Sequence, residues 1–357
     1  MLSWPTATNW PTGVNWPTGV NWPTGVNWPG GGSGPPPPIN FADLFPSTFA
    51  VWQSDRGLSY GSLLRPNAGN AAATTIAVSG AIVGVPVPIW VVATNSLAVG
   101  AGATFDVYYD GLGVTPAMAG LTPTGGATIA LTGAGAGLGL TWTAANSVAG
   151  NAWKATCAGL LDQSANGKNA TQAASTRQPF IDAGPNGKPS ISFVTSLVTY
   201  FATPIVQPAP ATTPFTMYIV IATGASGGQQ NYMGVNGSST IYDPAGAGAI
   251  VQQYCGSVAN SSPLTPGLLS RVLADFSASV TDRTKAGASA LATGASAGNM
   301  TNGTTLEIGA GGAGGTLPAT MKLLMAAVGP RLTDAQYQAI DAALNSPGGY
   351  GPGAIAV

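Results

Sequence analysis

The sequence contains no histidine, and only 6% of its 357 residues are charged. Without histidine the chain cannot build a Ser-His-Asp or Cys-His catalytic constellation or a histidine-ligated zinc site, which excludes most catalytic designs that act near neutral pH. The 11 basic and 12 acidic residues are scattered, with no basic stripe for phosphate groups and no polybasic segment for a membrane surface. The composition therefore predicts a protein that binds rather than catalyses, with no nucleic acid and no membrane insertion.

Cysteine is also scarce. The two cysteines, Cys157 and Cys255, are too few for a disulfide framework or a four-thiolate zinc site. Two buried free thiols are the simplest expectation, and a single bridge between them is the alternative.

Neither a signal peptide pattern nor a long uninterrupted apolar run is present. The N-terminus lacks a basic region followed by an apolar core, which predicts synthesis in the cytoplasm. Residues 66–105 contain no charged residue, but Pro86, Pro88 and several glycines interrupt them. We therefore expect strands in this segment instead of a transmembrane helix.

Glycine (51 residues) and proline (29 residues) are abundant, and 45% of the chain is apolar. The apolar residues form short runs rich in Val, Ile, Tyr and Phe, separated by turn-forming residues, a pattern typical of many strands joined by turns. One helix is expected near the C-terminus. There Thr333 and Gln336 form a capping box, Asp334 favours the helix dipole, and an apolar stripe runs to Leu344 before Pro347 ends the helix.

The N-terminal segment is a hexapeptide repeat. Residues 9–28 repeat NWPTGV, residues 3–8 are an imperfect copy, and a Trp-Pro pair recurs at Trp4, Trp10, Trp16, Trp22 and Trp28. Proline disfavours helix, so an extended arm is expected, and in polyproline II geometry all five indoles lie on one side. A row of tryptophans that the arm cannot bury by itself predicts multivalent docking to a repeating partner. A low-complexity tail without specific contacts is the alternative.

The sequence divides into four parts. The docking arm (1–29) is followed by a linker (30–38), which is Gly/Ser-rich and flexible and then proline-rich and stiff. A globular body follows, in which residues 71–153 form a nearly charge-free, strand-dense segment. This segment separates residues 39–70 from residues 154–357.

Several motifs of the body resemble a known family. They are LDQSANGKNATQ and QPFIDAGPNGKPSISF within residues 161–193, and GPRLTDAQYQAIDAAL near the C-terminus. These motifs resemble a turn, a strand and a closing strand with helix of the laminin-G-like or concanavalin-like jelly rolls common in bacteriophage virion proteins. Residues 44–58 resemble the first strand of that family, and residues 71–153 are similar to a small β-module of phage structural proteins.

The resemblance implies an all-β fold and a function. The fold is a concanavalin/laminin-G-like β-sandwich (jelly roll) from residues 39–70 and 154–357, with an inserted small β-domain. The implied function is a non-enzymatic structural protein on the virion surface, a capsid decoration or head fibre docked through the arm and displaying a lectin-like sandwich. The alternative is a tail or baseplate fibre adhesin that binds host-surface carbohydrate. Other virion proteins and sister copies, often in trimers, are the partners that the family implies.

Candidate ligand contacts follow from the same comparison. Aromatic platforms suit sugars, and the candidates are Tyr108, Tyr109, Tyr232 and Tyr242, with core or interface packing as the alternative. Sandwiches of this family often bind calcium at rim loops, which makes calcium a possible ligand of Asp162, Asn166 and Asn169. An Asx turn uses the same side chains. No other cofactor is expected.

No catalytic residue is predicted. A glycosidase needs two carboxylates that face one cleft, and the closest pair in sequence is Asp106 and Asp110. Asp110 precedes Gly111, a normal turn position, so turn chemistry is the favoured interpretation of this pair.

Overall fold

The computed structural model describes the body of the chain, which belongs to one compact unit beginning at Pro38. The arm (1–29), with Trp4, Trp10, Trp16, Trp22 and Trp28, and the linker (30–38) lie outside the described residues. The described residues are 39–67, 69–70, 74–82, 85–111, 115–206, 213–234, 239–255, 258–277, 282–294, 305–311 and 317–357.

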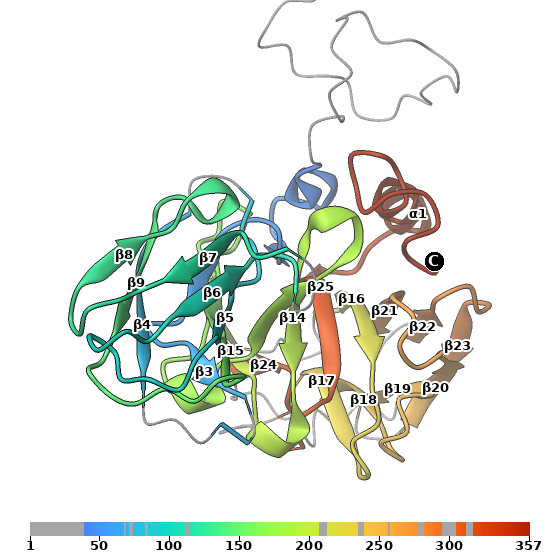
Figure 1. Cartoon of the computed structure of the whole chain (residues 1–357). Coiled ribbons are helices and arrows are strands. Elements are labelled where there is room, and N and C mark those ends of the chain that lie inside the picture. The colour runs from blue at the N-terminus through green and yellow to red at the C-terminus, as the bar shows by residue number, and fades with distance from the viewer. Residues whose placement is uncertain are drawn as a thin grey trace, which may run out of the picture. The chain divides into compact units, whose positions relative to one another are not determined.

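The body is all-β, as predicted, and its larger part is a sandwich of two antiparallel sheets (Figure 1). The first sheet has eight strands. In spatial order they are β13 (Phe180–Ala183), β14 (Pro189–Phe193), β25 (Met321–Pro330), β16 (Phe215–Thr223), β21 (Ser270–Phe276), β22 (Asp282–Ala286) and β23 (Ala292–Gly294), with β1 (Ala50–Gln53) paired to β25.

The second sheet of the sandwich has nine strands. In spatial order they are β2 (Leu58–Tyr60), β11 (Cys157–Leu160), β12 (Ala170–Thr171), β15 (Phe201–Val206), β24 (Thr305–Ile308), β17 (Gln230–Gly234), β18 (Ser239–Asp243), β19 (Ile250–Cys255) and β20 (Val258–Pro263).

Two small sheets form the insert, which occupies the chain between β2 and β11. Because β2 and β11 pair with each other in the nine-stranded sheet, the insert leaves and re-enters the sandwich between neighbouring strands. One small sheet contains β3 (Arg65–Pro66), β10 (Ala152–Lys154), β5 (Trp90–Ala93), β6 (Phe105–Tyr108) and β7 (Met118–Leu121). The other contains β4 (Ile76–Gly80), β9 (Leu138–Trp142) and β8 (Thr128–Ala130).

Strand β16 shows how the layers are built. Successive side chains of a strand point to opposite faces, and Met217 and Ile219 of β16 belong to the core between the two sheets. Tyr218 and Val220 point the other way, into a second core beneath helix α1 (Asp334–Leu344). Both faces of β16 are covered, which is why this strand is apolar on both sides. We call the face toward α1 the outer face of the eight-stranded sheet.

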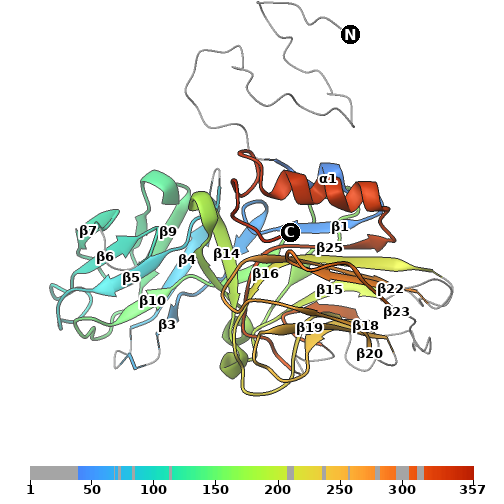
Figure 2. The same cartoon turned by 90° about the vertical axis from the view of Figure 1, so that its right-hand side faces the viewer.

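Helix α1 lies along β1 and β25 on this outer face (Figure 2). The predicted capping box is confirmed: the Thr333 side chain accepts from the Gln336 N–H, and the Gln336 side chain accepts from the Thr333 N–H. Tyr337, Ile340 and Leu344 are the buried apolar residues of the helix. Short 3₁₀ helices occur at Phe41–Leu44, Gly133–Gly135, Ser175–Arg177, Pro185–Gly187 and Thr195–Leu197.

The insert and the sandwich share one apolar core. In the insert, Phe105 packs against Trp142 and Trp153, with ring centroids 5.5 and 6.1 Å apart. These rings belong to the same buried cluster as Trp52 of β1 and Phe193 of β14. Continuous burial of large rings across the boundary predicts that the insert and the sandwich unfold together.

Cys157 in β11 is a buried free thiol, and burial raises the pKa of its thiol group. None of the helices in the described ranges is long and apolar enough to cross a membrane.

Candidate functional site

A cavity of about 590 Å³ lies where the insert meets the outer face of the eight-stranded sheet, and we call it the junction cavity. The insert strands lie beside β14 in both views (Figures 1 and 2). Cavities of roughly 300–1,000 Å³ are typical of small-molecule sites. The residues that line the cavity include Trp90, Lys154, Phe180, Asp182, Ser192 and Lys322.

The floor of the cavity is a row of side chains across neighbouring strands. Phe180 of β13 is the register partner of Ser192 in β14, and Ser192 is the partner of Lys322 in β25. Ile181 and Ile191, the residues next to them, point into the core between the sheets. Alternation along each strand therefore places this row on the outer face.

The wall of the cavity comes from the insert in the same way. Lys154 of β10 is the register partner of Arg65 in β3 and of Trp90 in β5. The neighbouring Trp153 and Val91 are fully buried in the core, so the Arg65–Lys154–Trp90 row faces away from it. Trp90 is half-buried, and its ring lines the cavity.

Floor and wall are joined by an ion pair between Lys154 and Asp182. The Lys154 ammonium also lies 4.6 Å from the centroid of the Trp90 ring and 5.2 Å from that of Phe180. Ser192 Oγ donates to Asp182 Oδ2 at 2.5 Å. The carboxylate therefore holds one donor from the insert and one from the sandwich, each charge-assisted and so stronger than a neutral hydrogen bond.

Burial and the neighbouring charges shift the pKa values of Lys154 and Asp182 in opposite directions. Burial is the largest influence on Lys154 and lowers the pKa of its ammonium, while Asp182 partly restores it. Burial opposes ionisation of Asp182, but the charges of Lys154 and Lys322 and the hydrogen bonds from Lys154 and Ser192 outweigh it, so the pKa of Asp182 is lowered. Asp182 is thus an ionised hydrogen-bond acceptor at neutral pH.

The lowered pKa of Asp182 predicts a pH-dependent contribution to stability. Between the lowered pKa of Asp182 in the folded chain and the ordinary carboxyl pKa, the unfolded chain binds more protons than the folded chain. The stability that Asp182 contributes is therefore complete above the ordinary carboxyl pKa. It is lost as the pH falls through the pKa of the folded chain. Asp182→Asn should therefore lower the free energy of unfolding by about 1–3 kcal/mol at neutral pH. The deficit should shrink in acid, as measured by urea unfolding across pH.

Asp110→Asn is the matched control, because Asp110 is an exposed aspartate in a turn. Its stability difference from the wild type should be small and should not follow the Asp182 profile. A deficit of Asp182→Asn that is equal at acidic and neutral pH would contradict the electrostatic account.

The structure does not bring the four predicted glycan-contact tyrosines together. Both lie in the nine-stranded sheet: Tyr232 is fully buried in the core between the sheets, while Tyr242 is 7% exposed and packs against Tyr254 on the face opposite the buried Ile241. Tyr109 is half-buried and donates its hydroxyl to the Thr132 carbonyl at 2.7 Å. Tyr108 is half-buried and is the register partner of Trp90, the aromatic residue that does line the junction cavity.

The candidate calcium ligands form an Asx-type turn. The Asp162 carboxylate accepts backbone N–H groups from Val51, Ser164 and Lys168 at 2.9–3.0 Å. The side-chain oxygen of Asn169 accepts from the Asp162 N–H, and the Asn166 amide donates to the carbonyls of Ser47 and Phe49. These side chains hold the turn against β1.

Asp106 and Asp110, the closest carboxylate pair in the sequence, lie at structural positions. Asp106 Oδ1 accepts from the Gly120 N–H at 2.8 Å and so connects β6 to β7. Asp110 is exposed in the turn that follows β6.

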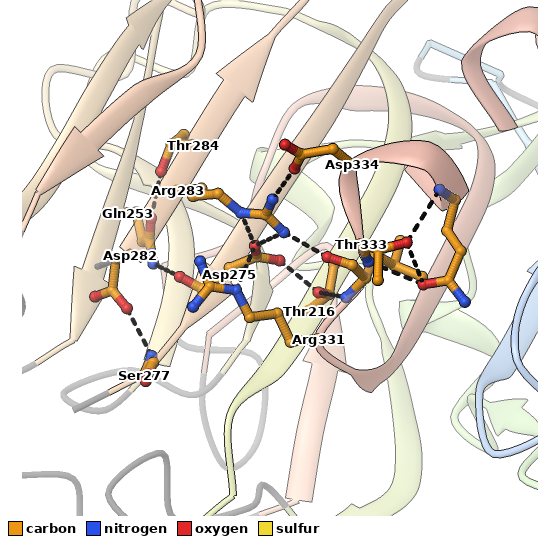
Figure 3. Close-up of polar contacts among 12 residues, drawn as sticks. Thr216, Gln253, Asp275, Ser277, Asp282, Arg283, Thr284, Arg331, Thr333 and Asp334 are labelled. Carbon is orange, nitrogen blue, oxygen red and sulfur yellow. Dashed lines mark hydrogen bonds and ion pairs between the residues drawn. The ribbon is translucent and has the colours of Figure 1, made fainter. Parts of the chain in front are cut away.

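A second cluster of charged side chains lies beneath the start of helix α1 (Figure 3). Arg283 of β22 contacts the Asp275 carboxylate of β21, the Leu332 carbonyl and Asp334 in the first turn of the helix. Asp275 is fully buried and also contacts Thr216 and Arg331. Burial raises the pKa of Asp275, and these contacts only partly oppose the rise. Asp275 does not line the junction cavity, and the cluster includes Asp334 in the first turn of α1, so we assign it to helix docking.

The cavity residues themselves escaped the sequence analysis. Trp90 was part of an apolar strand, and Lys154, Asp182 and Lys322 stood alone among apolar neighbours. The available signal was their rarity: a charged residue among apolar neighbours is unusual in a chain with 6% charged residues. Only the pairing of distant strands reveals that these charges meet.

Comparison with known proteins finds fold likeness only. No family model matches the chain, and no curated protein matches it. An arabinofuranosidase in complex with arabinofuranosyl-alpha-1,2-xylobiose matches 82% of this chain and 61% of its own at 11% identity, with a TM-score of 0.41. A GH54 α-L-arabinofuranosidase mutant matches 57% of this chain and 56% of its own at 13% identity, with a TM-score of 0.38. A Trypanosoma rangeli sialidase mutant with trans-sialidase activity matches 54% and 32% at 11% identity, with a TM-score of 0.36.

These findings contradict the predicted function. The sequence motifs implied a structural virion protein docked through its arm, whereas the similar structures are glycosidases and sialidases. The interpretation as a virion display protein, with its tail-fibre alternative, is therefore corrected. The motifs identified the jelly roll correctly, but one sandwich fold serves many functions, so the fold did not fix the role.

Proposed function

We propose that this protein binds a saccharide in the junction cavity and does not hydrolyse it. The observation that supports the proposal is the meeting of an aromatic ring, Trp90, with the charged and hydroxyl groups of Lys154, Asp182 and Ser192 in one cavity. Ligand sites combine apolar and aromatic walls with a few placed polar groups that fix orientation.

The chemistry of the two walls suits a sugar ring. A pyranose or furanose presents C–H groups on its faces and hydroxyls at its edge, so it needs an aromatic surface beside hydrogen-bonding groups. Trp90 and Phe180 offer aromatic carbon, while Ser192 and Lys322 offer polar atoms along the floor. Trp90 and Phe180 hold their positions through the contacts of Lys154 with both rings.

We propose binding without hydrolysis because of the number and the ionisation of the carboxylates in the cavity. Among the described residues that line the cavity, Asp182 is the one carboxylate, and glycoside hydrolysis ordinarily needs two. The lowered pKa of Asp182 keeps it ionised, so it cannot protonate a leaving group near neutral pH. Asp182 acts instead as a positioning residue for Lys154 and Ser192.

A binding experiment tests the proposal. The full chain is screened on a glycan array, and the bound glycans are titrated by calorimetry with wild type and Trp90→Ala. Removing an aromatic anchor costs about 2 kcal/mol or more, so affinity should fall at least about 30-fold. Trp90→Phe, which keeps an aromatic face, should retain part of the affinity.

The matched control is Tyr254→Ala. Tyr254 is a half-buried aromatic residue of the nine-stranded sheet, packed edge-on against Tyr242 with ring centroids 6.2 Å apart. This variant should bind like wild type. Equal affinity of wild type and Trp90→Ala would contradict the proposed site. Release of reducing sugar by the wild type would contradict binding without hydrolysis.

A further inference from the structure

Basic residues are concentrated at the junction cavity, although the chain contains few charged residues. The whole protein has a formal net charge of −1 and only 11 basic residues. Two of them, Lys154 and Lys322, line the cavity, and a third, Arg65, stacks 4.8 Å from the centroid of Phe180 in the cavity floor. Asp182 is the one carboxylate among the described residues that line this cavity.

The charges are not equivalent. Lys154 is 7% exposed and is engaged by Asp182, and the Arg65 guanidinium donates to the Ser175 carbonyl at 2.8 Å. Lys322 is exposed, and it takes part in none of the ion pairs found among the described residues. It nevertheless lies close enough to lower the pKa of both Lys154 and Asp182 through its charge. Lys322 is therefore the cation that a ligand can reach.

The strand register sets the direction in which this cation is presented. Lys322 stands beside Ser192 on one side and Ala222 on the other, all on the outer face. Ala222 is small, and Gly224 lies one residue beyond the end of β16, so neither places a bulky side chain on the cavity floor beyond Lys322. An anionic group seated there would contact Lys322 while the rest of the ligand extends toward Trp90.

We propose that the saccharide taken by the junction cavity is anionic, with its carboxylate or sulfate bound by Lys322 and its ring against Trp90. The inference rests on the proposed function, since it names the ligand class of the same cavity. Net positive charge in a cavity attracts anions and favours them over neutral analogues, because the two sides are electrostatically complementary. Asp182 restrains Lys154, so that the excess charge is concentrated at Lys322.

Matched oligosaccharides test the inference on the full chain. Two pairs compare a neutral oligosaccharide with a carboxylate-bearing one: galactan with galacturonan, and glucan with glucuronan. Sulfated galactan tests a sulfate in place of the carboxylate. We expect the anionic members to bind at least about tenfold more tightly than the neutral ones, as a charge-assisted contact allows, with affinity falling as salt rises. Lys322→Gln should remove that preference without weakening the neutral ligands, and Lys322→Arg should keep it.

Lys168→Gln is the charge-matched control. It removes one exposed lysine in the turn after β11, outside the junction cavity, and should leave the preference unchanged. If neutral and anionic partners bind equally, and Trp90→Ala abolishes both, the cavity binds saccharides and the anionic inference is overturned. If no saccharide binds wild type, the proposed function fails as well. Because Lys322 is exposed, its variants should fold normally, which circular dichroism checks.

Discussion

Replacing Asp341 by asparagine should lower the free energy of unfolding by about 3–5 kcal/mol, because it leaves a buried guanidinium without its counter-charge. Arg271 of β21 is fully buried, and both oxygens of Asp341 in helix α1 receive its hydrogen bonds. Tyr218 of β16 donates to the same carboxylate at 2.6 Å. Urea unfolding followed by tryptophan fluorescence measures the loss.

Two further variants separate charge from packing. Asp334→Asn removes another carboxylate of the same helix, but its side chain is 65% exposed, so the loss should stay within about 1 kcal/mol. The double variant Arg271→Met with Asp341→Leu replaces both charges by apolar groups and should be more stable than Asp341→Asn. A double variant no more stable than the single one would contradict the explanation by an unpaired charge.

Phe105→Ala should cost about 3–5 kcal/mol and should destabilise the sandwich as well as the insert. Phe105 is fully buried between Trp142 and Trp153, in a cluster that continues to Trp52 of the sandwich. A cavity in this shared core removes contacts from both parts. Calorimetry should show one transition at a lower temperature in the variant.

Phe105→Leu is the conservative control, and it should cost much less because most of the volume is kept. Val148→Ala is the surface control in the insert, where an exposed side chain contributes little. Two separate transitions, with only one shifted by Phe105→Ala, would show that the insert and the sandwich are independent folding units.

The function of the chain could not be predicted from its motifs. Residues 161–193 resembled a jelly roll, and the jelly roll is present, but the role that the family implied is contradicted. The reason is general: motifs of this kind record turn and strand geometry, while ligand recognition depends on side chains on the outer faces of strands. Asp162 illustrates it, because its carboxylate serves three backbone N–H groups of the turn.

The sequence by itself determined the local structure. The capping box of Thr333 and Gln336 begins helix α1 as predicted, and short apolar runs form strands, among them Pro189–Phe193 and Phe215–Thr223. Local hydrogen bonds and the alternation of side chains along a strand involve neighbours in sequence, so they can be inferred from one segment at a time. The lack of histidine likewise restricts the chemistry before any fold is known.

Only the tertiary structure decided the site. Lys154 and Asp182 are 28 residues apart, and Lys322 comes from the far end of the chain, yet β10, β13 and β25 bring their charges to one cavity. The four tyrosines were plausible ligand contacts in the sequence, but burial of Tyr232 depends on which face its strand presents to the second sheet. Long-range strand pairing and register set these outcomes, and a shift of one residue would reverse them.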